Sequence, residues 1–482
     1  MEYEAVIGLE THIQLNTRTK IFCGCKADSW VDQPNTNICP VCTGMPGVLP
    51  VLNERVVEKG VLLAAAMHAE PQAVSFFDRK NYFYPDLPKG YQISQYDRPL
   101  ATGGYMDVPQ ADGSTRRVSI WKLHIEEDAG KTKNELGMRL IDFNRCGVPL
   151  VEMVTGPDLR SADEAANYLI RLRQLLRWIG VSEADMEKGH LRCDANVSLR
   201  PKGATILNTK TEIKNVNSID AVRAAIEKEI ERQTREYEAG GRIESWTLEW
   251  DDDSGTLKKM RSKETEADYR YFREPDLLPI QLSEAWKASI LAGLPELPLV
   301  RAARFASQYG LPTYDADILT VERSLSDYFE SAVQAYAGQS PTADAAKRVS
   351  NWLMNDVARL LNDSGQTAAG LKLTPTYLAA IIKLVDAGTV NNNTGKGLLE
   401  KVNSTGQAPD EIVAAQGLAR VSDDGAIRAV VAQVIAESAT EVASYKGGKV
   451  GLMGWFVGQV MKKMQGKADA QKTRSLLEEM LK

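Results

Sequence analysis

Carboxylates, one imidazole and several basic side chains recur in the first half of this chain at positions where they could do chemistry. Every Cys and His lies at or before residue 193 of the 482 residues, so metal, proton and nucleophile chemistry is expected there. A hard, oxygen-rich ligand set with one imidazole suits Mg²⁺ or Mn²⁺ better than zinc or copper. The candidate metal ligands and catalytic groups are Glu10, His12, Glu127, Glu152, Asp194 and Glu212.

Basic side chains form a second candidate set, for phosphate. Arg presents a planar fork and Lys a mobile point charge to phosphate oxygens. The chain has neither a G-x-x-x-x-G-K-[ST] loop nor a strand-linked G-x-G-x-x-G, so metal ions and basic side chains would have to hold ATP. These candidates are Lys80, Arg192, Arg200, Lys210 and Lys214.

Three segments alternate between apolar and polar residues, which predicts half-buried β-strands. Sheets with one packed and one wet face are typically antiparallel. Solvent alone explains one such polar face, but three faces with imidazole, acid and guanidinium groups favour a site. The polar faces carry Glu10 and His12 in 7–15, His190, Arg192, Asp194 and Arg200 in 190–200, and Lys210, Glu212 and Lys214 in 210–215.

Two carboxylates lie in apolar surroundings. Glu152 interrupts the apolar run 148–154, and alternation in 120–128 places Glu127 on one face with Leu123 and Ile125. An ionised carboxylate without a partner would cost several kcal/mol there, so each acid needs a metal, a basic residue or a raised pKa. The alternative to a metal is an internal ion pair, for example with Arg145.

Four cysteines form two paired-thiol turns, C-G-C and C-P-V-C. This spacing predicts a closed structural zinc site, with disulfides or free thiols as the alternatives. The four predicted zinc ligands are Cys23, Cys25, Cys39 and Cys42. Cys146 and Cys193 are expected to be small buried residues.

Composition predicts a soluble, multidomain, cytoplasmic enzyme. The net charge is −6 and 43% of residues are hydrophobic, and neither a signal peptide nor an 18-residue apolar span occurs. The exception is residues 446–482, where eight Lys or Arg stand against three acids. Such a basic patch favours contact with a polyanion, although a solvated helical face would have the same composition.

Helix signals divide the chain. Ser161 and Ser218 are predicted N-caps of helices that end at Gly180 and at Gly240, and these helices should cover the apolar face of the sheet. Near 293–298 strands give way to successive helices, which indicates a domain boundary, and 403–409 is a second predicted linker.

Six motifs, taken together, resemble the B subunit of glutamyl/aspartyl-tRNA(Gln/Asn) amidotransferases, and the resemblance extends over nearly the whole chain. Arg273 departs from the pattern, since the family more often has Pro after Tyr-Phe. The motifs are IGLETH (7–12), DRKNYFYPD (78–86), YQISQY (91–96), HIEEDAGK (124–131), LRCDAN (191–196) and DYRYF (268–272).

The resemblance implies an α+β fold in which a largely antiparallel cradle resembles glutamine synthetase. It implies a catalytic cradle with the zinc cluster over 1–293, a helical domain over 294–408 and a small helical, tRNA-binding tail over 409–482. The implied reaction uses ATP and Mg²⁺ to phosphorylate the side-chain carboxylate of Glu or Asp misacylated on tRNA(Gln) or tRNA(Asn). Ammonia then displaces the phosphate.

Residue by residue, the resemblance implies catalytic roles and two magnesium sites. The catalytic positions are Glu10, His12, Lys80, Glu127, Glu152, Asp194 and Glu212. The magnesium sites are His12, Glu127 and Glu152 for one ion, and Glu10, Asp194 and Glu212 for a second, ATP-linked ion.

The implied partners are the A and C subunits of such an amidotransferase, of which the first releases ammonia from glutamine, and misacylated tRNA bound through 446–482. No glutaminase signature occurs in this chain, which is consistent with ammonia from another polypeptide. Two alternatives stay open: a non-catalytic, zinc-stapled scaffold that binds tRNA, and a ligase that acts on a free amino acid.

Overall fold

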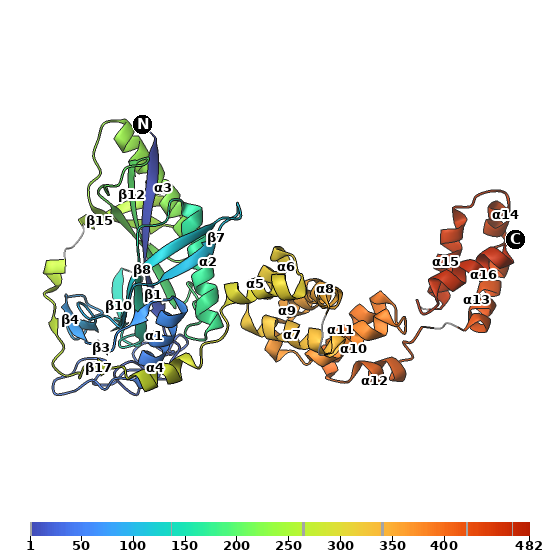
Figure 1. The fold of residues 1–482 in the computed structure, drawn as a ribbon, viewed down its shortest axis with the longest axis horizontal. Helices are drawn as coiled ribbons and strands as arrows, with labels where there is room; N and C mark the ends of the chain where they lie inside the picture. The colour runs from blue at the N-terminus through green and yellow to red at the C-terminus, as the bar shows by residue number, and fades with distance from the viewer. Residues whose placement is uncertain (1, 136, 263–265, 339–341, 421–422, 465) are drawn as a thin grey trace. The chain divides into compact units, whose positions relative to one another are not determined.

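A computed structural model describes residues 2–135, 137–262, 266–338, 342–420, 423–464 and 466–482 (Figure 1). The chain forms two compact units, Met1–Leu297 and Pro298–Lys482. Strands and helices both occur in the first unit, and the described part of the second unit is helical. The predicted α+β class is therefore confirmed.

A ten-stranded sheet is the centre of the first unit. Its order is β15-β14-β13-β12-β1-β11-β8-β6-β2, with β7 paired to β8. All pairs are antiparallel except β13 with β14. The strands are β1 (Tyr3–Gln14), β2 (Glu70–Pro71), β6 (Ala101–Thr102), β7 (Tyr105–Pro109), β8 (Thr115–Glu127), β11 (Pro149–Thr155), β12 (Leu191–Pro201), β13 (Thr211–Val216), β14 (Trp246–Asp251) and β15 (Thr256–Ser262).

Helices cover the apolar face of this sheet, as the alternation predicted. Leu169 and Leu172 of α2 (Ala162–Trp178) and Ile226 of α3 (Ile219–Glu238) share one core with Ile7 and the other inward residues of β1 and β12. The Ser161 hydroxyl accepts the backbone N–H of Glu164, and the Ser218 hydroxyl accepts that of Ala221, so both predicted N-caps are confirmed. Helix α1 (Glu54–Ala66) joins the same core.

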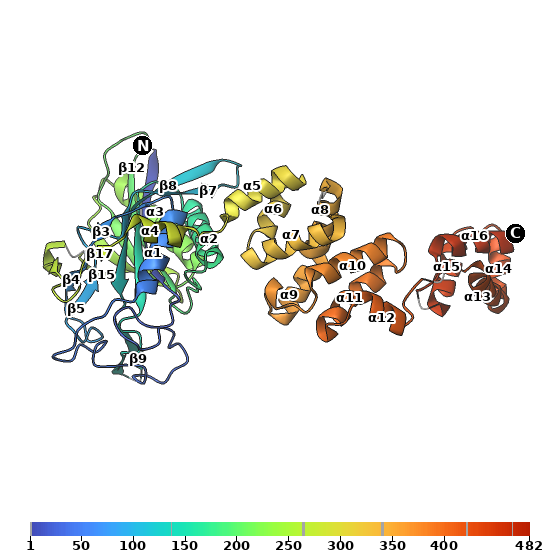
Figure 2. The ribbon, with the colours of Figure 1, turned by 60° about the horizontal axis from the view of Figure 1, so that its bottom comes forward.

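Smaller strands border the main sheet. A three-stranded sheet has the order β16-β4-β5 and a hairpin pairs β9 with β10. The loop between β1 and α1 lies beside this hairpin (Figure 2), where the Asn35 N–H donates to Asp142 Oδ1 at 3.0 Å. The remaining elements of this unit are β3 (Val74–Ser75), β4 (Asp78–Asn81), β5 (Tyr91–Ser94), β9 (Lys131–Glu135), β10 (Met138–Asp142), the 3₁₀ turn η1 (Glu266–Tyr269), β16 (Phe272–Arg273), β17 (Ile280–Gln281) and α4 (Glu284–Leu291).

The second unit contains two hydrophobic cores. One includes Phe305 and extends to Ile412 and Val413 of α12, beyond the linker expected at 403–409, and the other includes Phe456. The predicted domain boundaries at 293/294 and 408/409 stay predictions. The helices are α5 (Pro298–Tyr309), α6 (Thr313–Leu319), α7 (Arg323–Ala337), α8 (Ala343–Trp352), the π-turn η2 (Leu353–Val357), α9 (Ala358–Ser364), the 3₁₀ turn η3 (Ala368–Gly370), α10 (Pro375–Asp386), α11 (Asn392–Thr405), α12 (Pro409–Ala415), α13 (Asp424–Glu437), α14 (Ala439–Lys446), α15 (Leu452–Lys463) and α16 (Ala470–Met480).

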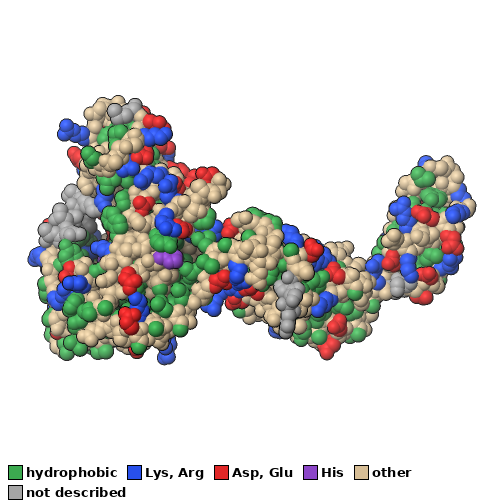
Figure 3. Space-filling model, viewed as in Figure 1, with side chains coloured by type: hydrophobic (Ala, Val, Ile, Leu, Met, Phe, Trp, Pro, Cys, Tyr) green, Lys and Arg blue, Asp and Glu red, His purple; other side chains and the backbone are tan. Residues whose placement is uncertain are grey.

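The basic residues of the tail 446–482 are partly neutralised by acids of the preceding helix α13. Lys463 lies 2.9 Å from Glu437, and Lys472 lies 2.9 Å from Asp424. Lys and Arg side chains alternate with Asp and Glu over α13 to α16 on the face in Figure 3. Gln465 of this tail is outside the described residues. None of the described helices is both long enough and apolar enough to span a bilayer.

We expect the core around Phe456 to unfold separately from the core around Phe305. Phe456→Ala should remove about 3–5 kcal/mol from the core that it fills, because both rings are fully buried. In scanning calorimetry, this substitution and Phe305→Ala should lower the midpoints of different transitions. A single transition that both substitutions lower equally would contradict the prediction.

Candidate active site

The register of β1 collects the predicted acids on one face of the sheet. His12 pairs with Glu152 of β11 on one side and with Arg192 of β12 on the other, and Glu10 pairs with Asp194. Paired residues of antiparallel strands project from the same face. The structure therefore brings together side chains that lie more than 180 positions apart in the sequence.

The first group of converging ligand atoms is His12, Glu126 and Glu152. Its three donor atoms all lie within 4.8 Å of one another, and His12 Nε2 is 3.7 Å from Glu126 Oε1 and 3.7 Å from Glu152 Oε2. In an octahedral Mg²⁺ site with bonds of about 2.1 Å, adjacent donors lie about 3 Å apart and opposite donors about 4 Å. The spacing and the oxygen-rich chemistry of this first triad therefore fit a magnesium ion.

Glu126, and not Glu127, completes this triad. Strand β11 pairs Glu152 with His124 and Leu150 with Glu126, so His124 and Glu126 of β8 share the acidic face. Glu127 projects from the other face, where it accepts the Ile93 N–H at 2.9 Å and pairs with Lys89. The structure thus does not bring Glu127 to His12. Glu126 was not predicted from the sequence, because the apolar face of 120–128 favoured Glu127, although His124 was a signal on the opposite face.

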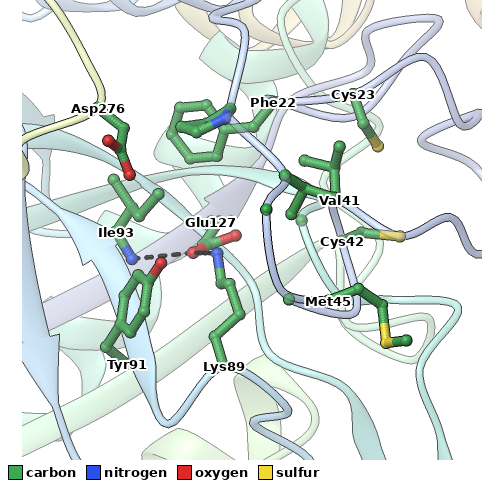
Figure 4. A pocket seen from close by; sticks show the side chains of 15 residues that line it. Phe22, Cys23, Val41, Cys42, Met45, Lys89, Tyr91, Ile93, Glu127 and Asp276 are labelled. Carbon is green, nitrogen blue, oxygen red and sulfur yellow. Dashed lines mark hydrogen bonds and ion pairs between the residues drawn. The ribbon is translucent and has the colours of Figure 1, made fainter.

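Glu127 instead lines a cavity of about 210 Å³ beside the cysteine cluster (Figure 4). Phe22, Cys23 and Cys42 border the cavity from the loop after β1, and Lys89 and Tyr91 border it from β5 and the preceding turn. The Lys89 ammonium and the Glu127 carboxylate meet inside it. Adjacent carboxylates of β8 therefore serve two different environments on the two sides of the sheet.

Buried cations keep Glu152 ionised. Burial raises the pKa of the Glu152 carboxyl, but the charges of His124, His12 and Lys80 together hold that pKa well below its usual range. His124 Nε2 is 2.9 Å from Glu152 Oε2, close enough for an ion pair although the ring N–H is not aligned for a hydrogen bond. Burial lowers the pKa of His124, and the carboxylates of Glu152 and Glu126 raise it by more. The triad is thus set among charges that compensate one another.

A second triad shares His12 and faces β13. Donor atoms of Glu10, His12 and Asp194 lie within 4.8 Å of one another. Burial and the Glu152 carboxylate raise the pKa of Glu10, as expected for acids packed together without an ion. This donor set also fits a hard divalent cation.

Glu212 lies at the edge of the second triad. It is 3.7 Å from Lys214 and accepts the Thr247 hydroxyl at 3.2 Å. Lys214 also pairs with Asp194. Burial lowers the pKa of Lys214, but the Asp194 and Glu212 carboxylates raise it by more. Lys214 is therefore a cation held directly beside this triad.

The other basic candidates divide into near and distant groups. Burial lowers the pKa of Lys80, but the charges of Glu126 and Glu152 raise it by more, which places the ammonium in the field of the first triad. Arg192 donates to Asp128 Oδ2 at 2.8 Å. Arg200 pairs with Glu4, six residues or roughly 20 Å along β12 from Asp194, and the exposed Lys210 precedes β13. The structure does not bring Arg200 to the triads.

The four cysteines of the two thiol turns converge. Their sulfur atoms lie within 4.8 Å of one another, whereas four thiolates around zinc would be about 3.8 Å apart. None of the six cysteines, all of which are described, forms a disulfide. Cys146 and Cys193 are buried outside the cluster, as predicted.

A buried lysine supports the thiolates. Lys20 is fully buried, donates to Asn37 O at 2.9 Å and lies 3.7 Å from Cys42 Sγ. The Cys23 thiol, the Cys39 N–H and the Lys20 ammonium hold the pKa of Cys42 at about 5 against the effect of burial. Cys42 is therefore prepared to carry negative charge, and the donor set of four cysteine sulfurs fits a structural metal ion.

Comparison with known proteins gives the same family as the sequence motifs. The family model of the GatB/GatE catalytic domain matches residues 5–288, and that of the GatB domain matches residues 327–481. Curated relatives named as the B subunit of an aspartyl/glutamyl-tRNA(Asn/Gln) amidotransferase include one from Persephonella marina, 47% identical over 482 residues, and one from Thermodesulfovibrio yellowstonii, 48% identical over 483 residues. Both matches cover 100% of each chain. The chain therefore belongs to the family of B subunits of aspartyl/glutamyl-tRNA(Asn/Gln) amidotransferases.

Proposed function

We propose that this chain uses ATP and Mg²⁺ to phosphorylate the side-chain carboxylate of Glu or Asp misacylated on tRNA(Gln) or tRNA(Asn). Ammonia then converts the acyl phosphate to the amide, which gives Gln-tRNA(Gln) or Asn-tRNA(Asn). Family membership supports this reaction, and one observation carries it: two hard-ligand triads share His12 on a single face, with a lysine beside each. The phosphates of ATP and the substrate carboxylate are both anionic, so they can come together only where cations offset their charge.

We assign His12, Glu126 and Glu152 to one magnesium ion, with Glu126 in place of Glu127. Glu10, Asp194 and Glu212 remain for a second, ATP-linked ion. One imidazole nitrogen has a single lone pair, and His12 Nε2 is slightly closer to Glu126 and Glu152, at 3.7 Å each, than to Glu10, at 3.9 Å. Bound Mg²⁺ would neutralise the phosphate oxygens and polarise the phosphorus.

Lys80 and Lys214 are proposed to offset the negative charge of the reacting groups. In phosphorylation, a substrate carboxylate oxygen bonds to the γ-phosphorus of ATP while the bond from phosphorus to the ADP oxygen breaks. In amidation, the ammonia nitrogen bonds to the carbonyl carbon, phosphate leaves with the C–O bond electrons, and the nitrogen loses a proton. Lys80 beside the first triad and Lys214 beside the second are placed to offset the negative charge at each stage.

The wider assembly follows from the same proposal. A glutaminase partner, the A subunit, would supply ammonia from glutamine as amido donor, which makes the complex a carbon–nitrogen ligase of the EC 6.3.5 type. The C subunit would complete a cytoplasmic heterotrimer, and the basic tail 446–482 would contact tRNA phosphates. The cradle is proposed to share the glutamine synthetase architecture. Arg192, held by Asp128, stays a candidate phosphate ligand, whereas Arg200 does not.

We propose zinc for the cysteine cluster, and Cys25→Ser should abolish its binding. Four soft thiolates in a tetrahedron select zinc, so the wild-type chain should contain about one zinc ion. Elemental analysis of the purified chain should show its loss in the variant. Cys146→Ser is the matched control, because that thiol is buried outside the cluster. Equal zinc content in both variants would rule out this assignment.

Glu126→Gln should weaken Mn²⁺ binding and reduce amidation at least about a hundredfold, because it removes a charged ligand from the first triad. Glu127→Gln is the matched control, since its side chain points to the opposite face. Mn²⁺ affinity can be followed by electron paramagnetic resonance at fixed protein concentration. If Glu127→Gln releases Mn²⁺ and Glu126→Gln does not, the assignment of Glu127 implied by the family resemblance is correct.

The function itself is tested by amidation of Glu-tRNA(Gln) and Asp-tRNA(Asn) with ATP, Mg²⁺ and ammonium chloride. Wild type should form amide only with ATP, and Asp194→Asn should reduce the rate at least about a hundredfold. Undiminished turnover in Asp194→Asn would favour the scaffold alternative. Amidation of free glutamate without tRNA would favour the free amino acid ligase.

A further inference from the structure

Five tyrosine rings of the first unit lie in continuous contact, with the middle ring beside Lys80 and both end rings at the surface. The ring centroids of Tyr82 and Tyr84 are 5.7 Å apart, those of Tyr82 and Tyr269 6.1 Å, and those of Tyr269 and Tyr271 6.1 Å. Tyr271 stacks on Tyr96 at 4.3 Å with an interplanar angle of 11°. We call Tyr84, Tyr82, Tyr269, Tyr271 and Tyr96 the tyrosine row.

The middle and the ends of the tyrosine row differ in their surroundings. The Lys80 ammonium lies 4.7 Å from the ring centroid of Tyr269 and in the field of Glu126 and Glu152. Tyr84 is 48% exposed and Tyr96 is 39% exposed. The row thus connects the candidate reaction centre with solvent.

The row is preformed, although its members come from segments about 185 positions apart. Asn81 Nδ2 donates to Arg270 O at 2.8 Å and to Tyr269 O at 3.3 Å. Phe272 pairs with Arg79 across β16 and β4, and the Arg79 guanidinium holds Glu274 through two hydrogen bonds of 2.7 and 2.9 Å. These contacts hold the described parts of the two segments together without a ligand, and a preformed site favours affinity.

Arg270 and Phe83 flank the row, each between two of its tyrosines in the sequence. Arg270 has φ of 45°, a left-handed conformation that costs a residue with a side chain roughly 1–2 kcal/mol. Its guanidinium carbon lies 6.0 Å from the Phe83 ring centroid, and Phe83 is 78% exposed. A strained cation beside an exposed ring indicates a function that packing does not explain.

Exposed aromatic rings beside a cation are the chemistry that binds an unstacked nucleobase. The residues proposed for the ATP-linked ion include Asp194 of β12 and Glu212 of β13, on one side of His12. Three tyrosines of the row closely follow β4 and β5, and Ser94 Oγ of β5 donates to Glu126 of β8 at 3.0 Å on the other side. The substrate carboxylate must approach from the side that ATP leaves open. That carboxylate belongs to an amino acid esterified to the last ribose of tRNA, so the last base must lie nearby.

We infer that the tyrosine row, with Phe83 and Arg270, stacks the 3′-terminal adenine of the misacylated tRNA. This inference rests on the proposed function and adds the position of the acceptor end. The row fixes the terminal nucleotide so that the attached side chain reaches Lys80 and the first triad. Arg270 supplies a cation for the base or the adjoining phosphate.

Phe83→Ala and Tyr96→Leu test this inference in the complex with the A and C subunits. Both rings are exposed, so the fold should persist. Each substitution should raise the KM for misacylated tRNA by about fivefold to a hundredfold, the effect of losing one base–aromatic stack, and leave the KM for ATP unchanged. Tyr314→Ala is the matched control, because this tyrosine of α6 is 71% exposed in the other unit. An increase in the KM for ATP alone, or no increase in either KM, would overturn the inference.

A binding measurement separates this inference from the proposed function. Wild type should bind intact uncharged tRNA more tightly than tRNA that lacks its terminal adenosine, and both variants should bind the two forms equally. If wild type binds them equally, the stacking inference fails even where amidation is observed. If amidation is absent but the terminal adenosine still strengthens wild-type binding and not variant binding, the inference stands and the proposed reaction fails.

Discussion

The candidate site depends above all on the register of β1 between β11 and β12. Shifting β1 by one residue would turn Glu10 and His12 toward the core and move Leu9 and Ile13 to the polar face. Leu9 and Ile13 are essentially fully buried, and exposing each would cost about 1.5–3 kcal/mol. The apolar face therefore holds the chemistry of the polar face in position.

The second constraint is charge. Four carboxylates, those of Glu10, Glu126, Glu152 and Asp194, lie around one imidazole, an arrangement in which like charges repel. The compensating cations come from separate elements: His124 from β8, Lys80 from β4 and Lys214 from β13. The site is thus assembled by the tertiary structure, and no single segment of the chain contains a balanced set.

Strict alternation made much of this arrangement predictable. Strands β1 and β12 each have one apolar and one polar face, so period-two reasoning identified Glu10, His12 and Asp194 correctly as neighbours on one side. The two helix N-caps were predictable because Ser161 and Ser218 satisfy local backbone donors. Only the sequence immediately around these residues decides such features.

The end of β8 was not predictable in the same way. Glu126 and Glu127 are 2% and 3% exposed. Where a strand end is buried on both sides, alternation shows which residues share a face but not which of the two faces carries the site. The choice depends on pairing with β11, which is a long-range contact. The clustering of the tyrosine row was equally hidden, because it depends on β16 meeting β4. Likewise, the core around Phe305 includes α12, because Ile412 and Val413 pack into it. The turn residues at 403–409 do not reveal this packing.

The opposite orientation of Glu126 and Glu127 has an evolutionary consequence. One peptide bond joins the acid that faces the first triad to the acid that faces Lys89 and the cavity by the cysteines. Insertion or deletion of a single residue in β8 would exchange the two and damage both environments at once. Length variation among homologous chains is therefore expected in the exposed β9–β10 hairpin that follows, whereas the length of β8 itself should be inherited unchanged.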